Sequence, residues 1–333
     1  MRALLLDSPK AIDQLPLRLA ETQAPDPGPG EVRVRVNCCA LCRTDLHIVE
    51  GDLPLPRLPL IPGHQVVGRI DAIGPGSAHL RMDDRVGIPW LSSTDGVCEY
   101  CARGAENLCE QARFTGYHVN GGYADYAIAR ADFVHPVPTT FSDEQAAPLL
   151  CAGVIGFRAY RLSGAENGQS LGLYGFGGSA HLVLQLARHQ GCDVHVFTRA
   201  RAHRKLAEQL GAVWTGSADE QPPRRLDASI IFAPAGSLVP LALRHLRKGG
   251  TLALAGITMS EIPALDYSLL YQERIVRSVA NSTRADCRDF LRQAAEIPFR
   301  PRVEIYPMAQ ANSALLDLKQ SRIEGAAVLQ IKG

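Results

Sequence analysis

The sequence predicts a two-domain α/β protein, in which a β-rich domain is followed by a doubly wound parallel sheet. Three observations support this fold class. The chain has 333 residues, more than one hydrophobic core usually sustains. Short strand-like runs separated by turns fill the N-terminal part, and strands alternate with helical stretches after that. The content of 46% hydrophobic and 21% charged residues is that of an ordinary globular protein.

The β-rich part extends to about residue 150. Strand-like runs occur at Val32–Val36, Val66–Ile73 and Arg85–Ile88. Turns rich in proline and glycine, such as Pro25–Gly30 and Gly74–Gly76, separate them. This spacing indicates a sheet of short strands.

From about Cys151 the pattern becomes strand–helix alternation. The candidate strands are Leu171–Phe176, Val194–Arg199, Ala212–Gly216, Ala228–Phe232, Thr251–Ile257 and Ile275–Ala280. Helical stretches lie between several of them, at Ala180–Gln190, Arg201–Leu210 and Val239–Arg247. Six strands with helical crossovers are typical of a doubly wound parallel sheet. The remainder holds a helical pattern, a strand, another helix and a terminal strand, beginning with Asp286–Ala295 and ending with Ala326–Ile331.

Charge and cysteine content narrow the class of protein. Lys and Arg number 35 against 34 Asp and Glu, so no strong net field favours nucleic acid or an anionic membrane. No apolar run approaches the roughly 20 residues that span a bilayer, and the start lacks a secretory signal, which predicts a cytoplasmic protein. Nine unevenly spaced cysteines fit metal ligation and a few buried thiols better than disulfides.

A glycine-rich turn follows the first strand of the α/β part. Leu171–Phe176 runs into Gly175, Gly177 and Gly178, and a helix follows, with Ala180 in the third glycine place of the fingerprint. Gly175 permits a tight turn, and Gly177 lets backbone amides approach a pyrophosphate at the positive end of the helix. The strand–turn–helix context predicts a dinucleotide site rather than an ordinary turn.

The residues at the end of the next strand indicate whether the cofactor is NAD or NADP. NAD sites place an acidic residue there, and here Thr198 takes that place, followed by Arg199. Without a carboxylate a 2′-phosphate is not repelled, and a guanidinium grips it in a bidentate manner. Arg199 and its neighbours Arg201 and Arg204 could also form only a solvated helix start. We favour NADP over NAD.

A compact cluster of cysteines predicts a closed metal site. Cys98, Cys101 and Cys109 lie close together, and Asp95 precedes Cys98 with the spacing of a fourth ligand. Three thiolates and a carboxylate suit a structural zinc with no open position. The alternative is three buried thiols with Asp95 capping a turn.

A second set, Cys42, His64 and Cys151, is dispersed along the chain. Each residue alone would be read as structural. Together, two cysteines and a histidine with an open fourth position form one of the recognised catalytic zinc types.

These motifs together resemble the zinc-containing medium-chain alcohol dehydrogenases, with the yeast and bacterial branch as the nearest. The resemblance covers essentially the whole chain and is carried by Cys42–His47 (CRTDLH), Gly51–Pro56 (GDLPLP), Gly63-His64, Cys98–Cys109 (CEYCARGAENLC), Cys151 and the glycine turn. It implies a GroES-like catalytic domain from residues 1–151 and 285–333. A Rossmann dinucleotide domain, residues 152–284, would be inserted, with the active site in the cleft between the two.

The resemblance also implies a role for each motif residue. Cys42, His64 and Cys151 match the catalytic zinc ligands, while Thr44 and His47 match the proton relay from the substrate hydroxyl towards solvent. Asp45 matches the carboxylate that orients the zinc histidine. The remaining matches are Arg43 and Arg284 at the cofactor pyrophosphate, and Trp90 and Val49 in the substrate pocket.

Two positions depart from the family pattern. Gln65 stands where most members have a glutamate beside the zinc histidine, and Asp95 replaces the first cysteine of the structural cluster. Loss of the glutamate charge is expected to make the zinc more electrophilic. The expectation at Asp95 is zinc bound less tightly than by four thiolates, because oxygen is a harder ligand.

The predicted function is hydride transfer between a small alcohol, primary and either medium-chain or aromatic, and NAD(P). Two zinc ions per chain and a dimer or tetramer are expected from the resemblance. A zinc-free quinone or enoyl reductase is the main alternative, but it leaves Cys42, His64 and Cys151 without a purpose. Polyol dehydrogenation usually goes with a carboxylate in place of Cys151. A non-enzymatic role would predict broken zinc or relay positions.

Overall fold

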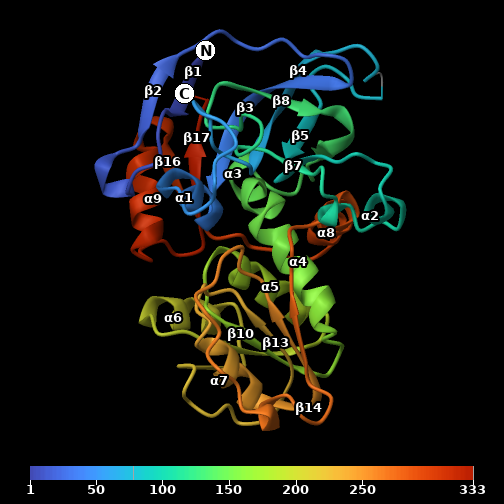
Figure 1. The fold of residues 1–333 in the computed structure, drawn as a ribbon, viewed down its shortest axis with the longest axis vertical. Helices are drawn as coiled ribbons and strands as arrows, with labels where there is room; N and C mark the ends of the chain where they lie inside the picture. Colours follow the sequence, from blue (N-terminus) through green and yellow to red (C-terminus); the bar gives the residue numbers. More distant parts are fainter. Residues whose placement is uncertain (78, 333) are drawn as a thin grey trace. The chain divides into compact units, whose positions relative to one another are not determined.

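The computed structural model describes residues 1–77 and 79–332, which form two compact units (Figure 1). The first unit comprises Met1–Cys151, Ser282–Ala295 and Pro301–Gly333, and the second comprises Ala152–Asn281 and Glu296–Arg300. The chain thus leaves the first unit after Cys151, the predicted boundary. It returns at Ser282, three residues before the predicted one, and the short segment Glu296–Arg300 belongs to the second unit.

The second unit is built on one six-stranded, fully parallel sheet in the order β12-β11-β10-β13-β14-β15. The strands are β10 (Ser170–Tyr174), β11 (Asp193–Phe197), β12 (Trp214–Gly216), β13 (Leu226–Ile231), β14 (Leu246–Leu254) and β15 (Ile275–Ser278). This order is that of the dinucleotide-binding doubly wound fold, so the predicted fold class is confirmed. All five residues of β10 are buried, as expected for a strand covered on both faces.

Helices accompany the strands of this sheet. They are α4 (Ala152–Ser163), α5 (Gly178–His189), α6 (Arg201–Gln209) and α7 (Leu238–His245), with the 3-10 turn η5 (Tyr267–Leu269). In α4, Gly156 lies against α5, and a Cβ atom there would come within 2.5 Å of the Val183 side chain. A glycine inside a helix therefore allows these two helices to pack closely.

The first unit contains a seven-stranded sheet in which β3 (Glu31–Leu41) is the longest strand. Its order is β16-β17-β3-β4-β5-β9, and β8 also pairs with β3. The valines of the VRVRV run alternate inwards, Val32, Val34 and Val36 being at most 2% exposed, while the arginines point to the other face. The other strands are β4 (Val66–Ile73), β5 (Arg85–Ile88), β8 (Tyr126–Arg130), β9 (His135–Pro136), β16 (Val303–Pro307) and β17 (Ala326–Gln330).

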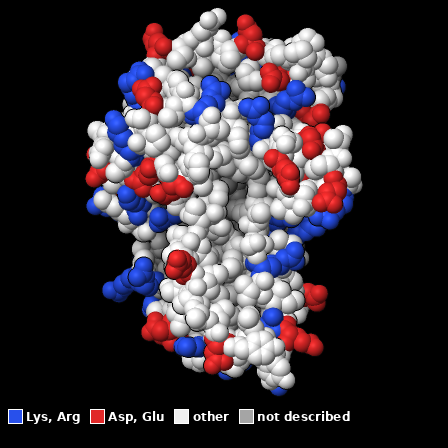
Figure 2. Space-filling model, in the orientation of Figure 1, with Lys and Arg blue, Asp and Glu red and all other residues white. Residues whose placement is uncertain are grey.

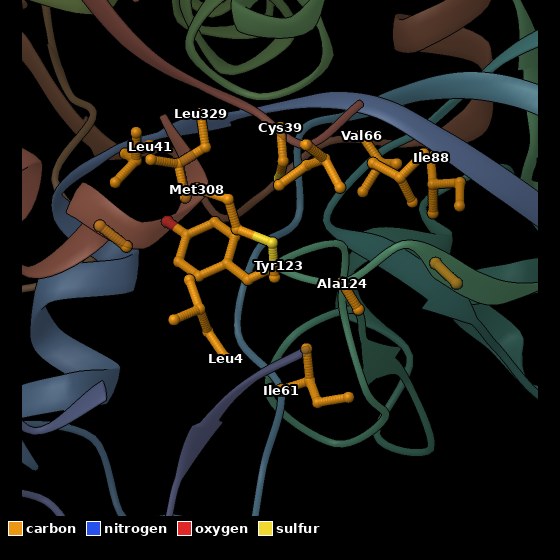
Figure 3. Close-up of a cluster of buried hydrophobic side chains, with 14 of the residues drawn as sticks. Leu4, Cys39, Leu41, Ile61, Val66, Ile88, Tyr123, Ala124, Met308 and Leu329 are labelled. Carbon is orange, nitrogen blue, oxygen red and sulfur yellow. The ribbon is translucent and has the colours of Figure 1, made fainter. Parts of the chain in front are cut away.

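The C-terminal segment completes this unit. β17 pairs antiparallel with β3, and α9 (Ala311–Lys319) packs near α1 (Arg43–Glu50). Figure 3 shows side chains from distant segments, among them Leu4, Tyr123, Met308 and Leu329, in one hydrophobic cluster. The first unit therefore depends on both ends of the chain.

Smaller elements connect these parts. They are β1 (Arg2–Leu6), β2 (Leu17–Glu21), β6 (Leu91–Ser93), β7 (Arg113–Phe114), α2 (Glu99–Ala102), α3 (Asp143–Ala146), α8 (Arg284–Glu296) and the 3-10 turns η1 (Ile12–Gln14), η2 (Glu106–Leu108), η3 (Ala131–Phe133), η4 (Ala147–Leu150) and η6 (Met308–Gln310). None of the helices described has the length and apolar character needed to cross a membrane. Basic and acidic side chains are interspersed over the face shown in Figure 2, in line with the near-zero net charge.

Candidate active site

Three segments of the first unit bring Cys42, His64 and Cys151 together. Cys42 caps α1, His64 lies in the turn before β4, and Cys151 follows η4. One ligand atom from each side chain lies within 4.8 Å of the others. The dispersed cysteines and histidine of the sequence therefore form one cluster.

Asp45 holds two members of this cluster in place. Its Oδ2 accepts a hydrogen bond of 2.9 Å from the Cys42 backbone N–H, and its Oδ1 lies 3.1 Å from Nδ1 of His64. Asp45 and His64 are both fully buried. With Nδ1 engaged, Nε2 of His64 faces the Cys42 sulfur at 3.3 Å and is the nitrogen left for a metal.

The turn that carries His64 requires glycine at position 63. Gly63 has a φ of +98°, and a Cβ atom there would lie 2.4 Å from the Tyr123 ring. Any side chain at this position would displace either the turn or the buried tyrosine.

Electrostatics favour a charged cluster. The hydrogen bond from Cys151, followed by the nearby His64, lowers the pKa of the Cys42 thiol well below its usual range, against the opposing effect of burial. Burial alone would lower the pKa of His64, but Asp45 and Cys42 raise it to about 10. Two sulfurs and an oriented imidazole nitrogen at this spacing fit a zinc ion in the Cys2His arrangement.

Two residues of α1 carry the predicted proton relay. Thr44 is 9% exposed, and its side chain hydrogen-bonds with Cys42. His47 lies one turn further along the helix, with Nδ1 2.7 Å from the carboxylate of Asp52. A carboxylate only accepts, so the proton of this hydrogen bond lies on Nδ1 and Asp52 orients the His47 ring. No role was predicted for Asp52, although it stands just beyond the end of the same helix.

An aromatic group lies beside His64. Trp90 meets the His64 ring edge-on at 4.8 Å between ring centroids and stacks on Phe114 at 5.0 Å, and Tyr117 lies 5.9 Å from Trp90. Phe114 and Tyr117 were not predicted from the sequence, because neither belongs to a metal or glycine motif. Val49 is fully buried in the core of the unit, and its role as a pocket wall stays a prediction.

The compact cluster is also assembled. Ligand atoms of Asp95, Cys98, Cys101 and Cys109 lie within 4.8 Å of one another. The Asp95 carboxylate accepts hydrogen bonds from the backbone N–H groups of Cys98 and Val97, which lower its pKa. Three thiols and an ionised carboxylate at this spacing fit a four-coordinate zinc.

Glu106, which lies between Cys101 and Cys109 of this cluster, pairs with Arg284. Its carboxylate accepts hydrogen bonds from the Arg284 backbone N–H at 2.7 Å and from the guanidinium at 2.7 and 2.9 Å. The same guanidinium lies 4.4 Å from the centre of the Phe133 ring. The predicted contact of Arg284 with the cofactor pyrophosphate stays a prediction, but the hydrogen bonds from Glu106 fix where Arg284 lies. The cysteine motif contains two acids, Glu99 and Glu106, and the sequence does not distinguish the one that pairs with Arg284.

The glycine turn of the second unit has the predicted geometry. Gly175 follows β10 with a φ of +85°, and a Cβ atom there would press on Ala233. Gly177 caps α5, and a Cβ atom there would meet nothing within 4 Å. An open approach to the N-terminus of α5, where Gly178 begins the helix, fits the pyrophosphate of a dinucleotide.

Thr198 and Arg199 follow the end of β11. Thr198 is 8% exposed, and its carbonyl accepts a hydrogen bond of 2.8 Å from Nε of Arg204. Arg204 also lies 3.5 Å from Glu220, whereas Arg199 and Arg201 are exposed. Arg204 is thus engaged in holding this turn. Arg43, the other predicted cofactor contact, begins α1 in the first unit and is half-buried.

Comparisons with known proteins agree with the fold. The family described as "Alcohol dehydrogenase GroES-like domain" matches residues 28–139, and "Zinc-binding dehydrogenase" matches residues 178–296. A probable alcohol dehydrogenase, AdhA, of Mycobacterium tuberculosis is 49% identical over 99% of this chain and 97% of its own length. An alcohol dehydrogenase of Geobacillus stearothermophilus is 37% identical, with 95% and 96% covered.

A solved structure shows the same likeness. The cinnamyl alcohol dehydrogenase of Sorghum bicolor superposes with a TM-score of 0.89 at 26% identity, covering 99% of this chain and 97% of that one. The chain therefore belongs to the zinc-dependent medium-chain alcohol dehydrogenase family. Its activity is that of an oxidoreductase acting on alcohols.

Proposed function

We propose that this chain is a zinc-dependent, NADP-preferring dehydrogenase of primary alcohols, with medium-chain and aromatic alcohols among its substrates. The observation that carries the proposal is the convergence of Cys42, His64 and Cys151 around a histidine oriented by the buried Asp45. A zinc-free reductase would give this arrangement no purpose.

The residues of the chain divide the chemistry between them. Zinc, when bound by Cys42, His64 and Cys151, supplies a Lewis acid towards the substrate oxygen, and the nicotinamide supplies the hydride acceptor. Thr44 takes the hydroxyl proton as the carbonyl forms and passes its own proton on. His47, held by Asp52, delivers it towards solvent from Nε2.

Substrate class follows from the aromatic group beside His64. Trp90 is 8% exposed and is held flat against Phe114, so a rigid apolar surface adjoins the metal ligands. An aromatic or medium-chain alcohol would bury more apolar area on such a surface than ethanol does. The cinnamyl alcohol dehydrogenase that shares this fold supports the same choice.

Cofactor preference rests on the end of β11. Thr198 places no carboxylate where a 2′-phosphate would sit, and the exposed Arg199 and Arg201 offer guanidinium groups to it. We also propose one structural zinc at Asp95, Cys98, Cys101 and Cys109, making two per chain. A cytoplasmic location stays a prediction.

The decisive experiment is a panel of alcohols and aldehydes run in both directions with NAD(H) and NADP(H). We expect kcat/KM for benzyl or cinnamyl alcohol to exceed that for ethanol at least tenfold, and the NADP(H) pair to be preferred. Dialysis against a chelator should abolish activity and added zinc should restore it. Full activity after chelation would support the zinc-free alternative, and a clear preference for NAD would refute the cofactor assignment.

A further inference from the structure

A cavity lies within the first unit and is lined in part by Arg284, the partner of Glu106 in the Cys98–Cys109 segment. It has a volume of about 500 Å³ and is formed by β9 with its flanking residues and by one side of α8. Arg284, Arg288 and Arg292 are spaced four residues apart along the helix and therefore share the face that lines the cavity. The rest of the lining is mainly apolar, including Val134, Val137 and Leu291.

Two of these arginines have no ion-pair partner in the part of the chain that the structure describes. Arg284 is paired with Glu106, and Asp132 in the wall lies 3.8 Å from Nε2 of His79. Arg288 and Arg292 are exposed, and neither has an acidic partner within 4.0 Å among the residues that the structure describes. The cavity therefore combines two uncompensated positive charges with an apolar wall.

His135 adds a polar group to the same wall. It is 6% exposed, and its Nε2 has no hydrogen-bond partner within the described ranges 1–77 and 79–332. Burial, together with Arg288 and Arg284, lowers its pKa to about 4, so the imidazole is neutral at pH 7. An unpaired buried polar atom of this kind is unfavourable, and a bound acceptor or donor would supply the missing hydrogen bond.

We propose that this cavity binds a small organic phosphate. A phosphate monoester carries about −1.5 to −2 charges at pH 7, which matches the two unpaired guanidinium groups of Arg288 and Arg292. The volume falls within the range of small-molecule pockets and exceeds what a bare phosphate fills, so the apolar wall would cover the organic part. Arg284 also lines the cavity and is the predicted pyrophosphate residue, but it takes no part in this assignment because it is paired with Glu106.

The test is calorimetric titration of the full-length protein, saturated with reduced cofactor, with phenyl phosphate. Saturation occupies the dinucleotide site and prevents the probe from binding there. We expect saturable binding that weakens at least tenfold in the double variant Arg288→Gln/Arg292→Gln. The variant Arg288→Lys/Arg292→Lys keeps both charges without the planar fork and should bind with intermediate affinity.

The control variant Arg18→Gln/Arg322→Gln removes two exposed arginines from elsewhere in the same unit and should bind phenyl phosphate like the parent. All these variants should keep the alcohol dehydrogenase kcat and KM, which shows that they are folded. Absence of saturable binding, or equal affinity in the parent and in Arg288→Gln/Arg292→Gln, would overturn the proposal. Equally tight binding of inorganic phosphate would refute the assignment to an organic phosphate.

Discussion

Asp95 contributes an oxygen to a cluster whose other three donors are sulfurs. Because its carboxylate is ionised and fixed by two backbone N–H groups, we expect it to complete the structural zinc site. Asp95→Ala should reduce the zinc content from two per chain to one and lower the melting temperature. Asp95→Cys should retain both ions and resist chelator longer, because thiolate binds zinc more tightly. Elemental analysis with thermal denaturation measures both, and one zinc per chain in the parent would contradict the assignment.

His181, fully buried in the first turns of α5, titrates abnormally. Burial lowers its pKa to about 4, although contacts with the backbone of Gly177 and Gly178 oppose this. Since the unfolded chain binds this proton near pH 6.5, the stability contributed by the neutral form is present above that pH and lost as the pH falls towards 4.

The parent should therefore lose about 2 kcal/mol more free energy of unfolding between pH 7 and pH 5 than the variant His181→Gln does. Urea denaturation of both proteins across this range measures the difference. Parallel stability curves would show that His181 is not the titrating group.

Residues that belong to a metal or turn motif could be predicted from the sequence, whereas the side chains that contact them could not. Cys42, His64 and Cys151 were found from residue type and family spacing, and the structure brings them together. Asp52 and Glu106 were missed because acidic residues are common and only a folded chain shows which base each one faces. The same holds for the unpaired His135.

At the scale of the element, the sequence located the strands but gave exact bounds for only some of them, since β3 and β14 differ from the predicted ranges. β4 and β5 have the predicted bounds, because turn-forming residues follow them, Gly74 after β4 and Pro89 after β5. α4 was not predicted, since Gly153 and Gly156 interrupt its helical pattern. Gly156 serves a tertiary contact with α5, which no local signal reveals.

An ion pair between Glu106 and Arg284 links the segment of the structural cysteine cluster to α8. Glu106 holds both the backbone and the side chain of Arg284 at the start of this helix. Glu106→Gln keeps the shape but removes the charge, so we expect a loss of about 2 kcal/mol in the free energy of unfolding. If Arg284 contacts the cofactor, the dissociation constant of NADPH should also rise severalfold.

Denaturation and fluorescence titration with NADPH measure these two effects. Glu110→Gln is the matched control, because Glu110 is exposed and directly follows Cys109 of the structural cluster. Unchanged stability in Glu106→Gln would show that the pair contributes no net energy. Lower stability with unchanged NADPH affinity would argue against Arg284 as a cofactor residue.

For the whole molecule, the sequence pattern separated a β-rich part from an α/β part. It did not reveal that the C-terminal segment returns to the β-rich part. That expectation came from the family resemblance, and the pairing of β17 with β3 gives its physical basis. Strand pairing across nearly 300 residues leaves no local mark, because each strand shows only its own alternation of side chains.

The parallel sheet of the second unit ends at β15, and exposed apolar side chains lie at this edge. β15 pairs with β14 alone among the strands described, so one row of its backbone N–H and C=O groups is open. Ile275 is 52% exposed, and Tyr267 and Tyr271 nearby are 72% and 60% exposed. Because an open apolar edge favours pairing with an identical edge, we expect a second copy of the chain to cover it and form a dimer.

Sedimentation velocity at micromolar concentration should therefore show the parent as a dimer or tetramer, and Ile275→Lys should shift it at least tenfold towards smaller species. A lysine on an edge strand opposes pairing through both charge and the loss of apolar area. Val213→Lys is the matched control, because Val213 is 54% exposed beside β12 at the opposite edge of the sheet. If Val213→Lys dissociated the assembly and Ile275→Lys did not, the contact would lie at the other edge.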